Sequence, residues 1–208
     1  MIELFSANTP NGWKISIMLE EIGYEYKVTK IDISHDEQFK PEFLKISPFG
    51  KIPVIIDHDN HESIFESGAI LMYLGDKSKK FYNEKDRITI NQWLMAQMGT
   101  VGPMIGQHHQ FHHYNPGKSK FGEERYFKIT KRIYGELDAR LKVSKFLAGP
   151  DYTIADIATW PWMARHEWHD IGLKNYKNLS RWYLEISERE GTVIGFSFMD
   201  KNAKIPQP

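Results

Sequence analysis

The chain has 208 residues, 41% of them hydrophobic and 26% charged, a composition typical of folded globular proteins and unlike that of disordered or membrane-embedded chains. Lysine plus arginine and aspartate plus glutamate each number 27, so no net field of one sign recruits nucleic acid or an anionic membrane. Cysteine is absent, which excludes disulfides, thiolate metal sites and a protein thiol nucleophile, so any thiol chemistry must use a thiol that a ligand brings.

The N-terminal part of the chain alternates strand and helix signals. A strand is predicted over residues 2–6, followed by a turn at residues 9–12 and a helix that Gly23 ends. A second strand is predicted at residues 26–33 and a short helix at residues 41–45, which completes a βαβ unit. The apolar residues of the first helix recur at the spacing of one helix face: Ile15, Met18, Leu19 and Ile22.

A hairpin and another helix follow. Residues 54–56 and 63–65 predict two short strands, and the polar residues 57–60 between them favour a turn. A further helix is predicted to begin at residues 66–68. The order of elements is therefore βαβαββα, an α/β arrangement.

The rest of the chain is predicted to be all helical. The polar stretch 76–80 is the expected linker between two domains, and two long amphipathic helices are predicted after it. Between these helices, residues 108–122 are rich in histidine, glycine and lysine, which predicts a helix end followed by a mobile loop.

The clearest helix start in the chain is at Thr153, whose spacing to Asp156 is that of a capping box. We interpret this pair as a structural device. The aromatic and histidine residues that follow are expected to fill the helical core: Trp160, Trp162, His166, Trp168 and His169.

The turn at residues 9–12 lies where a strand meets the N-terminus of a helix, and backbone N–H groups and the helix dipole there favour a developing anion. Thr9 can donate one O–H and Asn11 two N–H groups, and donors to the charged form lower the pKa of a thiol. A thiol placed here by a ligand would therefore ionise more readily. The alternative is that Thr9 or Asn11 only caps the helix.

Two other positions could hold a peptide ligand. Pro53 comes directly before a predicted strand. A cis bond there would turn the N–H and C=O of Ile52 outward, where they could pair in antiparallel fashion with the backbone of a peptide ligand. Glu66 and Ser67 precede a helix, where a hydroxyl, a carboxylate and backbone N–H groups could bind a zwitterionic ligand, which carries one positive and one negative group. A plain N-cap by Ser67 is the alternative.

Four histidines form two pairs at a four-residue spacing, His108 with His112 and His109 with His113. Such pairs could bind zinc. However, closed zinc sites made only of histidine are uncommon, and no carboxylate is evident nearby to orient the rings. We therefore predict no metal site and expect the cluster to form a polar wall of the active-site cleft.

Read together, these segments resemble the glutathione transferase superfamily over essentially the whole chain, and within it the bacterial Nu class of disulfide-bond oxidoreductases. The resemblance is carried by a series of short blocks in the same order. They lie at residues 9–12, 38–44, 46–48, 51–53, 65–70, 102–107, 124–126 and 152–162.

The resemblance implies a glutathione transferase fold, with a thioredoxin-like glutathione-binding domain at residues 1–78 and an all-helical domain at residues 85–200. It also implies a homodimer with glutathione as a bound co-substrate, no metal, and thiol–disulfide exchange with a small disulfide. The alternatives are conjugation of glutathione to electrophiles, reduction of hydroperoxides, and a non-catalytic binding module of the same fold. No apolar run approaches the ~20 residues of a membrane span and no signal peptide is evident, so a cytoplasmic location is expected.

The resemblance also assigns roles to individual residues. Asn11 and Thr9 would contact the glutathione sulfur, and Ile52, before a cis Pro53, would pair with the cysteinyl backbone. Glu66 and Ser67 would hold the γ-glutamyl end. Gln38 and Lys51 would help to hold the peptide and its glycine end, and Arg125 would approach a carboxylate. The tyrosine that many animal-type classes use is missing, because Phe5 ends the first strand; Ser6 is the neighbouring candidate activator.

Overall fold

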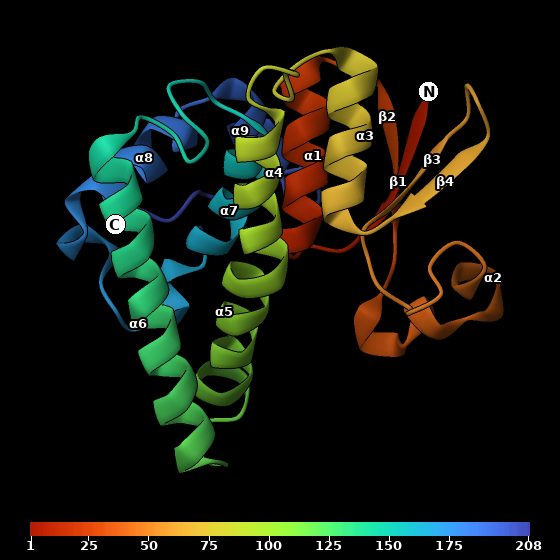
Figure 1. The fold of residues 1–208 in the computed structure, drawn as a ribbon. Helices are drawn as coiled ribbons and strands as arrows, with labels where there is room; N and C mark the ends of the chain where they lie inside the picture. The colour runs from red at the N-terminus through yellow and green to blue at the C-terminus, as the bar shows by residue number, and fades with distance from the viewer. The chain divides into compact units, whose positions relative to one another are not determined.

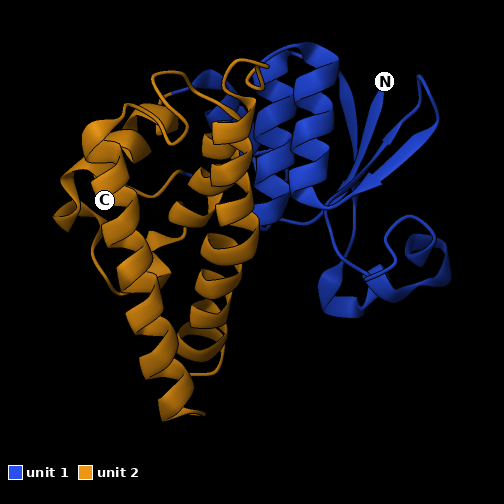
Figure 2. Cartoon of the chain, viewed as in Figure 1, with its two compact units in different colours: residues 1–80, 189–204 blue, residues 81–188, 205–208 orange.

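The computed structural model describes residues 1–208 (Figure 1) and divides into two compact units (Figure 2). Unit 1 comprises residues 1–80 and 189–204, and unit 2 comprises residues 81–188 and 205–208. The first boundary falls at the end of the expected linker. The second differs from the expected domain limits, because unit 1 also contains residues 189–204, of which residues 189–200 were assigned to the helical domain.

Unit 1 contains a four-stranded mixed sheet in the order β2-β1-β3-β4. β1 (Ile2–Ser6) runs parallel to β2 (Tyr26–Lys30) and antiparallel to β3 (Val54–Asp57), and β3 forms a hairpin with β4 (Glu62–Phe65). The predicted βαβ unit and hairpin are confirmed. β2 is shorter than predicted, since Asp32 accepts a hydrogen bond from Ser34 N and starts a 3-10 turn at Ile33–His35.

Two helices, α1 (Pro10–Ile22) and α3 (Ser67–Ser78), lie side by side and cover one face of the sheet (Figure 1). The apolar strand residues Ile2 and Leu4, which alternate toward that face, are at most 1% exposed. α1 ends at Gly23 in the left-handed conformation, as predicted. The short α2 (Pro41–Leu44) follows a second 3-10 turn, Glu37–Phe39.

The C-terminal helix α9 (Glu190–Phe196) joins unit 1 because it packs along α1. Arg189, just before α9, forms a bidentate ion pair with Glu21, with Nε–Oε1 and Nη2–Oε2 distances of 2.7 Å. Ser16 Oγ donates to Gly195 O at 2.6 Å. These contacts join residues far apart in the sequence, which explains why the local pattern placed residues 189–200 in the helical domain.

Unit 2 is all helical, as predicted. Its helices are α4 (Arg87–Ala96), α5 (Gly102–His108), α6 (Lys120–Val143), α7 (Ile154–Met163) and α8 (Lys177–Ser187). The capping box between Thr153 and Asp156 at the start of α7 is present. No helix of the chain combines the length and the apolar character that crossing a bilayer requires.

Residues 108–122 contain a helix end and a loop, as predicted. The helix continues past His108, because π-helical turns at Gln97–Val101 and His109–Tyr114 extend it from α4 through α5. It stops at Asn115, which precedes Pro116 and has non-helical φ and ψ of −134° and 53°. A residue before proline is disfavoured in the helical region, so the loop before α6 begins at Asn115 and covers residues 115–119.

The packing of α9 on α1 requires glycine at position 195. A Cβ there would lie 2.6 Å from the Cα and N of Ile17, which are backbone atoms that cannot move aside. Gly195→Ala is expected to lower the free energy of unfolding by about 1–3 kcal/mol, the usual cost of overpacking. Urea unfolding of the variant beside the wild type measures the difference.

Gly135→Ala is the matched control, because Gly135 lies on the exposed side of α6 and a Cβ there meets nothing within 4 Å. It is expected to stabilise the protein by about 0.5–1 kcal/mol through helix propensity alone. Equal effects of the two substitutions would contradict the proposed close packing at Gly195.

Candidate active site

The first turn of α1 carries the two residues predicted to serve a ligand thiol. Thr9 is the N-cap, with an extended backbone (φ −132°, ψ 159°), and its Oγ1 accepts a hydrogen bond from Gly12 N at 3.2 Å. The interpretation that Thr9 caps the helix is therefore correct. Capping leaves the hydroxyl able to donate, because its oxygen only accepts in this bond. Asn11 is the second residue of the helix and is half-buried.

Residues on both sides of this turn hold its shape. A Cβ at Gly12 would collide with the carbonyl oxygen of Ala7, so the close approach of the helix start to the end of β1 requires glycine. Trp13 Nε1 donates to Asn8 Oδ1 at 2.8 Å. Ser6 is fully buried and donates to Ala7 O at 3.3 Å, so its hydroxyl belongs to the support of the turn rather than to an open site.

The loop before β3 carries three more predicted residues. The Ile52-Pro53 peptide bond is cis, which is the geometry that the sequence analysis considered at this position. Ser47, which is 1% exposed, fixes the neighbouring backbone: its Oγ accepts from Lys51 N at 3.0 Å and donates to Lys51 O at 2.7 Å. The side chain of Lys51 is exposed.

Gln38 lies in the 3-10 turn Glu37–Phe39, three residues before α2 begins at Pro41. Its Nε2 donates to Ile33 O at 3.4 Å, a long bond, while its Oε1 is buried and accepts none. Gln38 therefore supports the loop that carries it through one weak contact.

Glu66 and Ser67 form the start of α3. Glu66 occupies the N-cap with φ 71° and ψ 113°, unusual for a residue with a side chain, and its exposed carboxylate makes no capping hydrogen bond. Ser67 is the first residue of the helix and is 6% exposed. The alternative that Ser67 is the N-cap is wrong, since Glu66 takes that place.

A residue that the sequence interpretation missed connects the two helix starts. Lys14, in the second turn of α1, donates from Nζ to Ser67 Oγ at 3.3 Å. Lys14 is 1% exposed, and burial lowers the pKa of its ammonium to about 7, against the opposing effect of the Glu66 carboxylate. A lysine inside an otherwise buried stretch of helix was the signal in the sequence that could have identified it.

The predicted site residues are divided between the two units. Eight of them lie in unit 1 and come from the starts of α1 and α3 and from the loops before α2 and β3: Thr9, Asn11, Gln38, Lys51, Ile52, Pro53, Glu66 and Ser67. Arg125 lies in α6 of unit 2, with its guanidinium 6.0 Å from the centroid of the Tyr126 ring. Its role toward a ligand remains a prediction.

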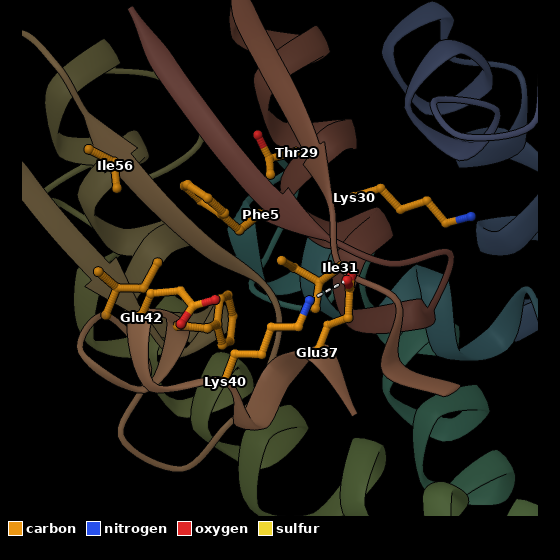
Figure 3. Close-up of a pocket in the computed structure, with 10 residues that line it drawn as sticks. Phe5, Thr29, Lys30, Ile31, Glu37, Lys40, Glu42 and Ile56 are labelled. Carbon is orange, nitrogen blue, oxygen red and sulfur yellow. Dashed lines mark hydrogen bonds and ion pairs between the residues drawn. The ribbon is translucent and has the colours of Figure 1, made fainter. Parts of the chain in front are cut away.

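A pocket of about 450 Å³ lies elsewhere in unit 1 (Figure 3). Phe5, which alternates to the side of β1 opposite Leu4, forms part of its wall together with Phe43 of α2. Lys40 at its rim is paired with Glu37 at 2.7 Å. None of the predicted site residues lines this pocket, although Ile52 packs against the apolar cluster that contains Phe5 and Phe43 of its wall.

Two of the four histidines, His108 and His109, belong to the interior of unit 2, whereas His112 is half-buried and His113 is exposed. The place of the cluster at the wall of an active-site cleft remains a prediction. His108 and His109 are at most 5% exposed, and His108 stacks on His112 with 4.8 Å between ring centroids. His169, fully buried, joins them: its Nε2 lies 2.8 Å from His109 Nε2, and its Nδ1 lies 2.6 Å from Tyr134 Oη. No group of three or more histidine or acidic residues in the chain is arranged to hold a metal ion.

The expected aromatic core of unit 2 is partly confirmed. Trp160 and His166 are buried, together with His169, but Trp162 and Trp168 are only half-buried. These two indoles flank His109, at ring-centroid distances of 5.8 and 5.3 Å. The half-buried tryptophans therefore cover His109.

The fold defines the class of protein. A four-stranded mixed sheet reached through βαβ and ββα units, followed in the chain by a unit made only of helices, is the thioredoxin-like plus all-helical arrangement of glutathione transferases.

Sequence comparison agrees with the fold. Residues 1–76 match the family model of the glutathione S-transferase N-terminal domain, and residues 95–190 match that of the C-terminal domain. The chain therefore belongs to the glutathione S-transferase family.

Among its relatives is the disulfide-bond oxidoreductase YfcG of Escherichia coli, 44% identical over 92% of this chain and 93% of that protein. A glutathione transferase from Burkholderia graminis, crystallised with two glutathione molecules per subunit, is 35% identical with a TM-score of 0.90, over 97% of this chain and 89% of that one. Another, from Pseudomonas putida with one glutathione disulfide per subunit, is 38% identical with a TM-score of 0.88, over 95% and 91%.

The backbone of Glu66 stores strain that glycine would relieve. A non-glycine residue at φ 71° costs about 1–3 kcal/mol, against about 0.5–1 kcal/mol of extra chain entropy that glycine loses on folding. Glu66→Gly is therefore expected to raise the free energy of unfolding by about 1 kcal/mol, measured by urea unfolding.

Glu62→Gly is the control for this test, because Glu62 is also an exposed glutamate but lies in β4. Glycine weakens a strand, so this variant is expected to be less stable than the wild type. A loss of stability in both variants would show that the Glu66 backbone is not strained.

The buried histidines make unit 2 sensitive to acid. Burial lowers the pKa of His109 to about 3 and that of His169 well below its usual value, so the unfolded chain binds protons that the folded unit does not. Their contribution to stability is present above about pH 6.5 and is lost as the pH falls toward 3. In His109→Gln, the decrease in unfolding free energy between about pH 7.5 and pH 5 should be smaller than in the wild type by about 1–2 kcal/mol.

Urea unfolding at both pH values gives this difference. Burial raises the pKa of Asp156 to about 6, which favours the folded state at low pH, but this opposing effect is common to both proteins and cancels. The exposed His61 provides the control, since His61→Asn should keep the wild-type pH dependence. An unchanged pH dependence in His109→Gln would overturn the assignment.

Proposed function

We propose that this protein is a glutathione-dependent disulfide-bond oxidoreductase that uses bound glutathione in place of a protein cysteine. The observation that carries the proposal is the first turn of α1, where the Thr9 hydroxyl and Asn11 stand at a helix N-terminus in a chain without any thiol. The similarity to YfcG, and to relatives crystallised with two glutathione molecules or with glutathione disulfide, supports the same reaction.

The role of the protein is to raise the fraction of glutathione present as thiolate. A free thiol of pKa ~8.5 is only a few per cent ionised at neutral pH. Donors from Thr9 and Asn11, together with the N-terminal end of the α1 dipole, would stabilise the sulfur anion. Nucleophilicity falls somewhat as the pKa falls, so a decrease of about one or two pKa units gives most of the available gain.

The exchange needs two glutathione molecules. The bound thiolate attacks one sulfur of the external disulfide, forms a mixed disulfide, and releases the other sulfur as a thiolate that takes up a proton. A second glutathione thiolate attacks the glutathione sulfur of the mixed disulfide, which yields glutathione disulfide and the second substrate thiol. Two electrons therefore pass from two glutathione molecules to the substrate.

The remaining site residues would hold the tripeptide. Ile52, before the cis bond to Pro53, would pair with the cysteinyl backbone, and Glu66 and Ser67 would bind the γ-glutamyl end. Gln38 and Lys51 would contact the peptide and its glycine carboxylate. Arg125, from the helical domain, would approach a carboxylate, and the family resemblance also implies a homodimer.

The first test compares two reactions of the wild type: glutathione-dependent reduction of a small disulfide, coupled to glutathione reductase, and conjugation of glutathione to chlorodinitrobenzene. Disulfide turnover is expected to exceed conjugation by a wide margin. Conjugation without disulfide turnover would instead identify a conventional transferase, and absence of both would favour a binding module.

Asn11→Ala tests the role of the first turn. Removing one donor to the sulfur anion is expected to lower the rate of disulfide reduction roughly 10-fold or more, because hydrogen bonds to charged groups contribute about 1.5–3 kcal/mol. The Kd for glutathione should change less than the rate, as measured by calorimetry. Asn202→Ala, at an exposed asparagine near the C-terminus, is the control, and equal activity of Asn11→Ala and wild type would remove Asn11 from the mechanism.

A further inference from the structure

The two faces of the sheet in unit 1 are covered unequally. α1 and α3 cover one face, whereas on the other side Phe43 of α2 packs with Ile31 and Val54 in a small apolar cluster (Figure 1). Phe5 and Ile46 lie against this cluster and stay half-buried. The pocket of about 450 Å³ opens at this place (Figure 3), and its volume is in the range of roughly 300–1,000 Å³ that small-molecule sites have. This side of the sheet therefore has room for a small ligand.

The register of the strands explains the apolar floor of the pocket. Phe5 pairs with Thr29 of β2, and Glu3, on the same face of β1, pairs with residue 56 of β3, an isoleucine. The Thr29 hydroxyl donates to Glu3 Oε1 at 2.5 Å, and this bond uses its only hydrogen. What remains open to a ligand is mainly apolar: the rings of Phe5 and Phe43 and the side chain of Ile56. Such a floor favours a ligand with an apolar body.

Two aromatic rings give the pocket a preference for positive charge. The centroids of the Phe5 and Phe43 rings lie 6.4 Å apart, and the ring planes are inclined by 58°. The face of an aromatic ring carries partial negative charge and attracts an organic cation within about 6 Å of the ring centre. Both rings line the pocket, so a cation that binds there lies beside aromatic carbon.

The charged residues of the rim point to the same sign of ligand. Lys40 Nζ is paired with Glu37 Oε1 at 2.7 Å, so this cation is already compensated. In Figure 3 the side chain of Lys30 leads away from the other residues that line the pocket, whereas the Glu42 carboxylate points toward them. Glu42 takes part in no hydrogen bond or ion pair, and its interaction with Lys40 is weaker than that of Glu37. The carboxylate directed at the pocket is therefore not neutralised.

We propose that this pocket is a binding site for a small organic ammonium ion with an aromatic or aliphatic body. The body would lie against Phe5, Phe43 and Ile56, and the ammonium group would pair with Glu42. An anionic ligand is disfavoured, because it would meet the Glu42 carboxylate while Lys40 is held by Glu37. The site goes beyond the proposed function and does not rest on it, since no predicted glutathione contact lines the pocket.

Three probes that share a phenyl chain test the sign of the charge: phenethylammonium, phenethyl alcohol and phenylpropionate. Titration of the isotope-labelled full chain, followed through its amide chemical shifts, gives a Kd for each probe. The ammonium is expected to bind roughly 3- to 10-fold more tightly than the alcohol, because a cation–π contact and a solvent-exposed ion pair each contribute modestly. The carboxylate is expected to bind most weakly.

The same titration locates the bound probe. Amide signals of residues 29–31 and 37–46 should move, because these two segments contribute most of the wall of the pocket. Equal affinities of the ammonium and the alcohol would overturn the proposal, as would tightest binding of the carboxylate. Shifts restricted to other parts of the chain would overturn it as well.

Two substitutions at the rim are expected to act in opposite directions. Glu42→Gln removes the carboxylate and should weaken phenethylammonium roughly threefold or more, while phenethyl alcohol binds as before. Lys40→Gln removes the neighbouring cation and frees Glu37, so it should strengthen phenethylammonium by a similar factor. Both residues are exposed, so neither substitution disturbs the core.

Glu62→Gln is the matched control, because Glu62 is an exposed glutamate of β4 that does not line the pocket. It should bind all three probes as the wild type does. A Glu42→Gln variant that keeps the wild-type affinity for the ammonium would contradict the assigned role of the carboxylate, and so would equal losses for the ammonium and the alcohol. The titrations contain no glutathione, so failure of this site and failure of the proposed function are distinguishable.

Discussion

The burial of α1 between the sheet, α3 and α9 positions the features on which the proposed chemistry depends. Nine of its 13 residues are buried, including an unbroken run from Gly12 to Leu19, so the helix is enclosed rather than laid on a surface. Gly12 lets its first turn approach the end of β1, and Gly195 lets α9 approach from another direction. The donors at residues 9–11 are thereby held on a helix that cannot shift independently of its neighbours.

This enclosure also shows how far sequence patterns could lead. Strands, turns and caps depend on neighbouring residues, so β1, the Gly23 end of α1 and the capping box at Thr153 could be predicted from the sequence alone. The place of α9 could not, because it depends on contacts between residues near 20 and near 190. Short-range periodicity carries no information about such pairs.

The candidate site divides in the same way. Thr9, Asn11, Glu66 and Ser67 were identifiable because they stand at helix starts, where backbone groups are available to a ligand. Lys14 was not, since periodicity treats a charged residue as a surface residue and the first helix was read as having a single apolar face. The spacing of the four histidines was visible in the sequence, but the burial of His108 and His109 was not, because His169, which contacts His109 and Tyr134, comes from another segment.

A protein without cysteine must control sulfur through the geometry of its ligand, and the connection between α1 and α3 supplies such control. Asn11 and Lys14 are three residues apart, which places them on neighbouring turns of the same helix. In the proposed function, Asn11 serves the sulfur, and Ser67, which accepts a hydrogen bond from Lys14, serves the γ-glutamyl end. The distance between the sulfur position and the carboxylate position would then be set by the rigid packing of two helices. Binding of the γ-glutamyl end at the start of α3 would place the glutathione thiol beside the first turn of α1. Binding energy from a part of the ligand that does not react would in this way orient the atom that does.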